Sequence, residues 1–407
     1  MQKYYPKNSM LSMLAAVVLI MNSGYYLSAI TDSYFPLILL IIFSAILTVW
    51  KSSGEKKIQL SSDNLLLILL LFGILSSTLI NFTAGNLLSG GRVAATMLCS
   101  YLMLKRLDIK RVTKSYSYII RFIIISAIIL FILTRSGQLT SFPLINSEHG
   151  AYYNLLFVTQ GLTASRICGA FWEPGVFASH IIIAFLFEIY FIDEKTKVIH
   201  IIIYMFGIFL TGSTAGILII ALVLAGYIIK RKNWDNRRDV KAIFFVIVIA
   251  GILTYDIIFE RLAAINPTLF SKLVETTSAT TYTRLNAPLV NLELFIQKPI
   301  FGWGFTGAAA QYSSYMNNRL VAQTSTSTQI MSAIGFLGII YTLMCLLPVF
   351  SKRKLAHLSL IDKTIIFASL LLIVNKEPHI YFAITWLILF YINQNSQISG
   401  AGKDGSL

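Results

Sequence analysis

The sequence predicts an all-α polytopic membrane protein with about twelve transmembrane helices and two large outer loops. Three observations lead to this fold class. Only 13% of the 407 residues are charged and 56% are hydrophobic, whereas about 25% charged residues is usual in soluble proteins. Apolar runs near bilayer-spanning length recur along the chain. The basic residues gather in alternate connecting segments, which is the pattern that orients membrane helices.

The apolar runs place the helices in order along the chain. The first run is too long for the core of a signal peptide, so we expect it to be a retained span. The expected helices cover residues 10–30, 34–50, 64–82, 87–104, 116–134, 174–192, 198–211, 213–229, 241–258, 327–350, 364–375 and 379–393.

These helices divide the chain into blocks. Helices one to five occupy residues 1–134, helices six to nine residues 174–258, and the last three residues 327–395. Two long outer loops cover 135–173 and 259–326, and residues 396–407 form a cytoplasmic tail. With both termini inside, most of the 33 basic residues fall on the cytoplasmic side. The net charge of +15 therefore reports topology, and no nucleic-acid partner is expected.

Some basic residues do not fit this sorting, because they lie within spans or on the outer side. Loops as long as the two outer ones usually carry function, so an outward-facing activity is expected. The guanidinium group suits a diphosphate, since its planar fork donates two parallel hydrogen bonds. For Arg92 the alternative is an arginine that only reaches the membrane interface. The basic residues in question are Arg92, Arg135, Arg166, Arg261, Lys272, Arg284, Lys298, Arg319 and Lys376.

Two acidic or mixed stretches are candidate sites. Glu173 precedes Pro174, which suits the first position of a helix, so the carboxylate would stand at the positive end of a helix dipole. A simple helix cap is the alternative for Glu173. Lys376, Glu377 and His379 interrupt an otherwise apolar hairpin and form a second candidate. No outer Asp-x-Asp pair occurs, so metal dependence is not expected.

Four further patterns occur in a fixed order. They are "RICGAFWEPGVFA" (166–178) before a span, "LTGSTAG" (210–216) between two spans, "KPIFGWGF" (298–305) after a predicted amphipathic helix, and "QIMSAIGFLG" (329–338) opening the next span. Over about residues 160–345 this order resembles the bacterial O-antigen and capsule repeat-unit polymerases and the related O-antigen ligases.

The resemblance implies a metal-independent glycosyltransferase with a GT-C-like fold in the bacterial inner membrane. Its donor and acceptor would be undecaprenyl-diphosphate-linked oligosaccharides, acted on at the outer face. By that analogy Arg166 and Arg284 match the arginines of the two outer loops that hold the donor diphosphate, with Arg92 and Arg319 as further candidates. Membrane lipid, a chain-length regulator and other polysaccharide assembly proteins are the partners implied; no cofactor is.

One departure from the family favours the polymerases. Ligases usually carry His-Asn about eleven residues before the Gly-x-x-Gly of the following span, and this chain has Thr324 and Ser325 there. A base for the acceptor hydroxyl is then expected elsewhere, with Glu173 first and His379 or Glu377 behind it. An O-antigen ligase and a flippase or other transporter of the same lipid-linked sugars remain the alternatives.

Overall fold

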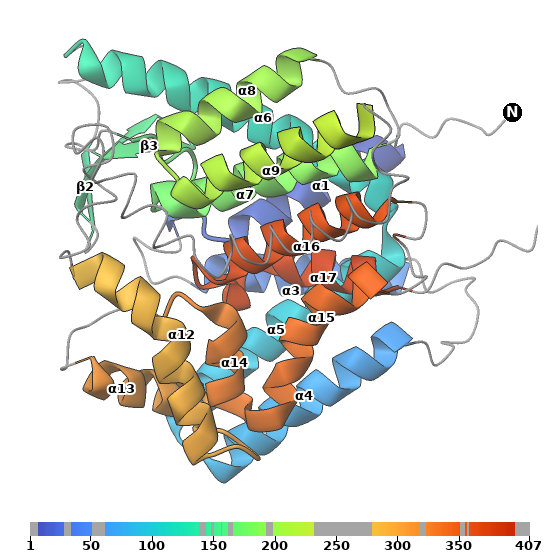
Figure 1. Ribbon diagram of the computed structural model, residues 1–407, viewed down its shortest axis with the longest axis vertical. Helices are drawn as coiled ribbons and strands as arrows, with labels where there is room; N and C mark the ends of the chain where they lie inside the picture. The colour runs from blue at the N-terminus through green and yellow to red at the C-terminus, as the bar shows by residue number, and fades with distance from the viewer. Residues whose placement is uncertain are drawn as a thin grey trace, which may run out of the picture.

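The computed structural model is mostly helical, as the sequence predicts (Figure 1). The structure describes residues 7–27, 34–50, 62–137, 144–147, 150–155, 157–161, 166–192, 198–231, 279–316, 323–350, 355 and 358–394. Of the expected helices, only that at 241–258 lies outside these residues.

The first half of the chain contributes helices that match the apolar runs closely. Polar caps set several boundaries: Thr83 accepts from Asn86 N before one helix, and Asp108 accepts from Lys110 N before the next. The helices are α1 (Lys7–Met21), α3 (Phe35–Trp50), α4 (Ser62–Ile80), α5 (Ala84–Arg106), α6 (Ile109–Arg135), α7 (Pro174–Leu186) with the π-helical turn η1 (Phe187–Phe191), α8 (Val198–Thr211) and α9 (Thr214–Arg231).

The second half begins with the expected amphipathic helix and ends in a helical hairpin. Ser359 and Asp362 form a capping box at the start of α16. The elements are α12 (Ala279–Gln297), α13 (Phe305–Tyr315), α14 (Thr326–Ile334), η4 (Gly335–Gly338), α15 (Ile339–Phe350), α16 (Leu360–Val374), η5 (His379–Tyr381) and α17 (Ala383–Asn393).

The segment between α6 and α7 holds a small antiparallel sheet, so an all-α fold is not the whole answer. Its three strands follow sequence order: β1 (Leu144–Ser147), β2 (Gly150–Leu155) and β3 (Val158–Gly161). Tyr152 faces Ile145 on one side and Gly161 on the other. The sheet lies at the same end of the helix bundle as α12 and α13 (Figure 1).

Within the residues that the structure describes, four helices are long and apolar enough to cross a membrane by length and composition: Ala84–Arg106, Ile109–Arg135, Pro174–Phe191 and Thr326–Phe350. Shorter apolar helices accompany them, among them α3, α4, α8 and α17. These features fit a helical membrane protein, and the count of twelve spans stays a prediction.

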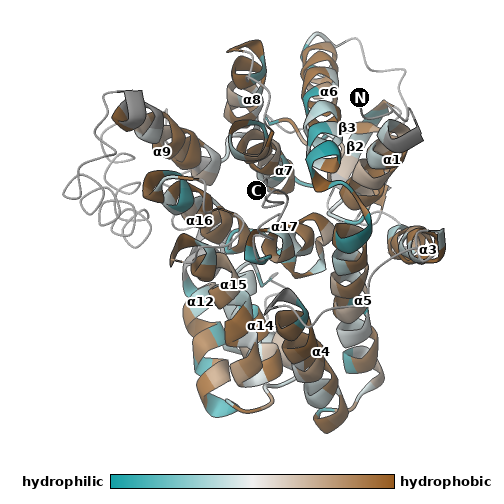
Figure 2. Ribbon diagram, turned by 90° about the vertical axis from the view of Figure 1, so that its right-hand side faces the viewer, coloured by the Kyte–Doolittle hydropathy of each residue, from teal (hydrophilic) through white to brown (hydrophobic). Residues whose placement is uncertain are grey.

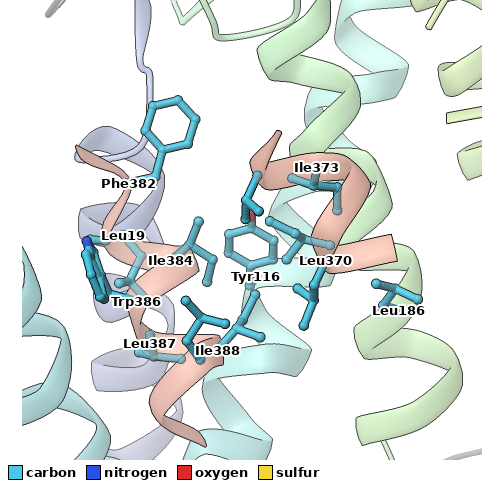
Figure 3. Packing of buried hydrophobic residues seen from close by; sticks show 14 of the residues in the cluster. Leu19, Tyr116, Leu186, Leu370, Ile373, Phe382, Ile384, Trp386, Leu387 and Ile388 are labelled. Atoms are coloured by element: carbon cyan, nitrogen blue, oxygen red, sulfur yellow. The ribbon is translucent and has the colours of Figure 1, made fainter. Parts of the chain in front are cut away.

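The core is centred on α17, which packs against α5, while the preceding helix α16 packs against α9. Figure 2 shows α17 between these two sides of the bundle. Figure 3 shows its inward side chains, including Trp386 and Ile388, together with Tyr116 of α6 and Leu370 of α16. The hairpin turn before α17 is therefore held in the middle of the molecule.

The glycine-rich motifs at 298–305 and 335–338 form a backbone clasp. Trp303 N donates to Ser332 O (2.9 Å), Gly304 N to Ala333 O (3.0 Å) and Phe336 N to Pro299 O (2.7 Å). Gly302 and Gly335 both have positive φ (66° and 69°), and a Cβ at either would overlap the opposing backbone. These glycines have a structural role, because the absence of a Cβ lets residues 299–304 pack directly against the break between α14 and η4.

Candidate functional site

Arg166 lies against the small-residue turn between α8 and α9. Ile167 N donates to Leu210 O (3.2 Å), which ties the two segments together. Gly212 has φ 59°, and a Cβ on it would lie 3.1 Å from Arg166 Cδ. Gln160 on β3 fixes the other side by donating to Arg166 O (2.9 Å). The absence of a side chain at Gly212 leaves the space that the Arg166 side chain occupies.

Glu173 occupies the N-cap position of α7, with Pro174 at the first helical position as predicted. Its backbone is extended (φ −142°, ψ 143°), yet its side chain makes no capping hydrogen bond. Glu173 thus holds the cap position of α7 without a capping hydrogen bond from its side chain. The carboxylate remains near the positive end of the helix dipole.

Glu377 comes to the same place from the hairpin turn. A Cβ built on Gly175 would overlap Glu377 Oε1, and that same point lies 3.8 Å from Glu173 Oε1. The two carboxylate oxygens are thus within about 6 Å of each other, the most that these two distances allow together. Glu377 is 2% exposed, whereas Glu173 is partly exposed. Two residues far apart in sequence form a carboxylate pair at the start of α7.

Lys376 brings a second cation to the α8–α9 turn against which Arg166 lies. Its Nζ donates to Ser213 Oγ (3.4 Å), one residue beyond Gly212. The turn at 212–213 therefore has the arginine on one residue and the lysine on the next. Two separate segments, 166–173 and 376–377, each contribute one cation and one carboxylate, and both cations contact the uncharged turn at 212–213.

His379 lies in the turn between α16 and α17 and is fully buried. Its Nδ1 is 2.7 Å from Thr385 Oγ1, and its backbone N–H donates to Thr326 Oγ1 (2.9 Å). The Thr326 hydroxyl in turn donates to Glu377 O (3.0 Å). Burial lowers the pKa of His379, so the imidazole is neutral at pH 7. Among the described residues its Nε2 has no hydrogen-bond partner.

The start of α14 is polar and locked onto the hairpin. Asn375 Oδ1 accepts from Ser325 Oγ (3.0 Å) and also from Ser327 Oγ. Thr324, at the position of the ligase histidine, is 7% exposed, and its hydroxyl oxygen has no partner among the described residues. The 375–379 turn is thereby held by several hydrogen bonds, which fixes the position of Glu377.

The other predicted arginines are placed less closely. Arg92 of α5 is exposed and stacks on the Tyr381 ring, 4.7 Å from its centroid. Arg284 lies on α12, but its side chain is outside what the structure describes. Arg319 lies outside the described residues.

Sequence reasoning missed several participants. Ser213, Thr326 and Asn375 carry no charge, and only the small-residue turn around Ser213 gave a signal. It also missed a separate polar cluster toward the other end of α7, where Glu188 accepts from Arg121 Nη1 (2.5 Å) and lies 2.8 Å from His200 Nδ1. No group of three His, Cys, Asp or Glu residues that could hold a metal ion occurs in the described part of the chain.

Comparison with known families gives one match. Residues 199–346 match the family model described as O-Antigen ligase. Over these residues the protein is similar to the O-antigen ligase family. This confirms the family resemblance drawn from the sequence motifs and supports a membrane glycosyltransferase of the ligase and polymerase type. No curated protein matches the chain.

The matched region, residues 199–346, contains only part of the candidate site. Ser213, Arg284 and Thr326 lie within the matched residues, whereas Arg166, Glu173, Lys376 and Glu377 lie outside them. The flanking segments fold back onto the domain through the contacts at Gly212, Ser213 and Thr326.

Proposed function

We propose that this protein is a repeat-unit polymerase that joins undecaprenyl-diphosphate-linked oligosaccharides at the outer face of the bacterial inner membrane. The observation that carries the proposal is that two segments, 166–173 and 376–377, bring Arg166 and Lys376 together at the 212–213 turn and Glu173 and Glu377 together at the start of α7. Cations beside carboxylates suit a reaction in which a diphosphate leaves and a hydroxyl loses its proton.

In the proposed mechanism Arg166 and Lys376 hold the diphosphate of the growing chain, with Arg284 and Arg319 as candidate further contacts. A sugar hydroxyl of the incoming lipid-linked unit attacks the anomeric carbon, and the bond from that carbon to the diphosphate oxygen breaks. The bonding electrons leave with undecaprenyl diphosphate, whose developing charge the cations stabilise. Glu173 accepts the hydroxyl proton, and the chain grows by one unit.

The assignment of Glu173 as the base is supported by its partial exposure and by its position at the start of α7. Glu377 and His379 are more deeply buried, and both are held by the Thr326 hydroxyl through backbone groups. We assign them to shaping the site around Glu173. Thr324 supports polymerase over ligase, since a hydroxyl cannot replace the histidine as a base at neutral pH.

The test is the surface glycan of a bacterium lacking this gene, together with mass analysis of its lipid-linked intermediates. A polymerase mutant leaves single repeat units on the final carrier and loses the ladder. Full polymer stranded on undecaprenyl diphosphate would instead mean a ligase, and single units held on the cytoplasmic leaflet would mean a flippase.

Complementation with variants then tests the residues. Arg166→Ala and Glu173→Gln should abolish the ladder at normal membrane abundance. Arg135→Ala and Glu293→Gln are matched controls, because both side chains are exposed elsewhere on the chain. Normal chain lengths with Arg166→Ala would refute the donor assignment.

A further inference from the structure

Arg92 lies on the opposite side of the hairpin turn from the Arg166 cluster. Lys376 contacts Ser213 at the α8–α9 turn, whereas Arg92 of α5 stacks on Tyr381 at the other end of the same turn. α5 packs on α17 and α9 packs on α16, and Figure 2 shows α5 and α9 on opposite sides of α17. The turn that carries Glu377 thus has a cation on each side.

The surroundings of Arg92 are suited to a phosphate-bearing headgroup. Tyr34, just before α3, is 43% exposed and close enough to Tyr381 to interact electrostatically with its hydroxyl. The Arg92 guanidinium offers several N–H donors to phosphate oxygens, and the Tyr381 ring beneath it and the neighbouring Tyr34 each add one hydroxyl donor to this region. Arg92 forms no ion pair with any carboxylate that the structure describes.

The helix surface next to Arg92 is open. Gly91 is exposed, and a Cβ built on it would have no atom within 4 Å. Arg92 is about 12 Å along α5 from its first residue, at 1.5 Å per residue, and at this level α5 reaches the η5 turn through the contact of Arg92 with Tyr381. A ligand headgroup could therefore approach from the lipid side without displacing protein.

We propose that Arg92, Tyr381 and Tyr34 form a second diphosphate site, which holds the acceptor lipid while the Arg166 cluster holds the donor. This inference rests on the proposed function, since a polymerase consumes two substrates that each carry a lipid diphosphate. The acceptor's sugar would then reach Glu173 and Glu377 from the α5 side of the turn, and the donor's from the α9 side. A ligase, whose acceptor is a different glycolipid, has no need of two equivalent sites.

The experiment measures binding of undecaprenyl diphosphate to the full-length protein in phosphatidylcholine nanodiscs, by titration with radiolabelled lipid. Wild-type protein should bind two equivalents. Arg92→Ala should lose one of them, with affinity at least tenfold weaker, and keep the other. Tyr381→Phe, which retains the ring beneath the guanidinium, should weaken the same equivalent less, and Arg135→Ala should leave both.

Comparing the variants separates this inference from the proposed function. If Arg166→Ala leaves both equivalents while Arg92→Ala removes one, the donor assignment fails and the second site stands. A single equivalent in the wild type, or two in Arg92→Ala, overturns the second site. Displacement of the Arg92-dependent equivalent by a modest excess of phosphatidylglycerol also overturns it, since the site would then hold ordinary phospholipid.

Discussion

Replacing Gly175 by alanine tests whether the carboxylate pair matters as a unit. The new Cβ would overlap Glu377 Oε1 and lie 3.1 Å from Glu377 Cδ, against 3.4 Å or more for ordinary contact. The overlapped atom is the end of a flexible side chain, so the carboxylate can move away by about 1 Å at modest cost in stability, roughly 1–3 kcal/mol. A misplacement of about 1 Å at a reacting centre typically lowers the rate by about 100-fold.

We therefore expect Gly175→Ala to reach the membrane in near-normal amount and to have about 1% of the wild-type transfer rate. The assay is incorporation of labelled lipid-linked repeat units into polymer by membranes of equal protein content. Gly307→Ala is the matched control, because its Cβ would meet only Trp303 Cβ at an ordinary 3.7 Å. Wild-type activity in Gly175→Ala would refute the role given to the position of Glu377.

Three further predictions concern the supports of the site. Thr326→Val removes the hydroxyl that donates to Glu377 O and accepts from His379 N. The free energy of unfolding should fall by about 1–3 kcal/mol, measured by a thermal melt, and an unchanged stability would contradict the role of this hydroxyl. Burial raises the pKa of the Cys168 thiol to about 11, so it stays protonated at neutral pH and should resist maleimide until the protein is unfolded; rapid labelling of native membranes would contradict its burial. Arg121→Ala removes the arginine partner of Glu188 and should lower the free energy of unfolding by about 3 kcal/mol. Adding Glu188→Gln should restore part of that loss. Equal melting temperatures for the single and double variants would argue against the pair.

The helices were predictable because long apolar runs have few alternatives in a chain with so little charge. The ends of the predicted spans at 34–50, 116–134 and 198–211 lie no more than seven residues from the ends of α3, α6 and α8, and both ends of α8 coincide with the prediction. The small sheet was not foreseen. Its strands have four to six residues, and their alternation is too short to stand out within a loop.

The candidate site was predictable as a set of residues but not as an arrangement. Local signals marked Glu173, through Pro174, and the charged hairpin turn, through its contrast with the apolar runs. Their meeting at Gly175 depends on how α7 and the α16–α17 hairpin pack, which no local pattern encodes. The glycine itself looked like part of a motif, and its reason is the carboxylate that lies where a side chain would be.

The position of α7 bears on how the protein is inserted. Of its membrane-length window 83% is buried, against 33% for α6, so α7 faces protein rather than lipid. Two polar side chains, His180 of α7 and Glu188 of the following η1, bond to α6: His180 to Tyr116 (2.5 Å) and Glu188 to Arg121 (2.5 Å). A lone α7 in the bilayer would leave these groups unsatisfied. We expect α6 and α7 to enter the membrane as a pair, so that biogenesis waits at α6 until its partner has been synthesised.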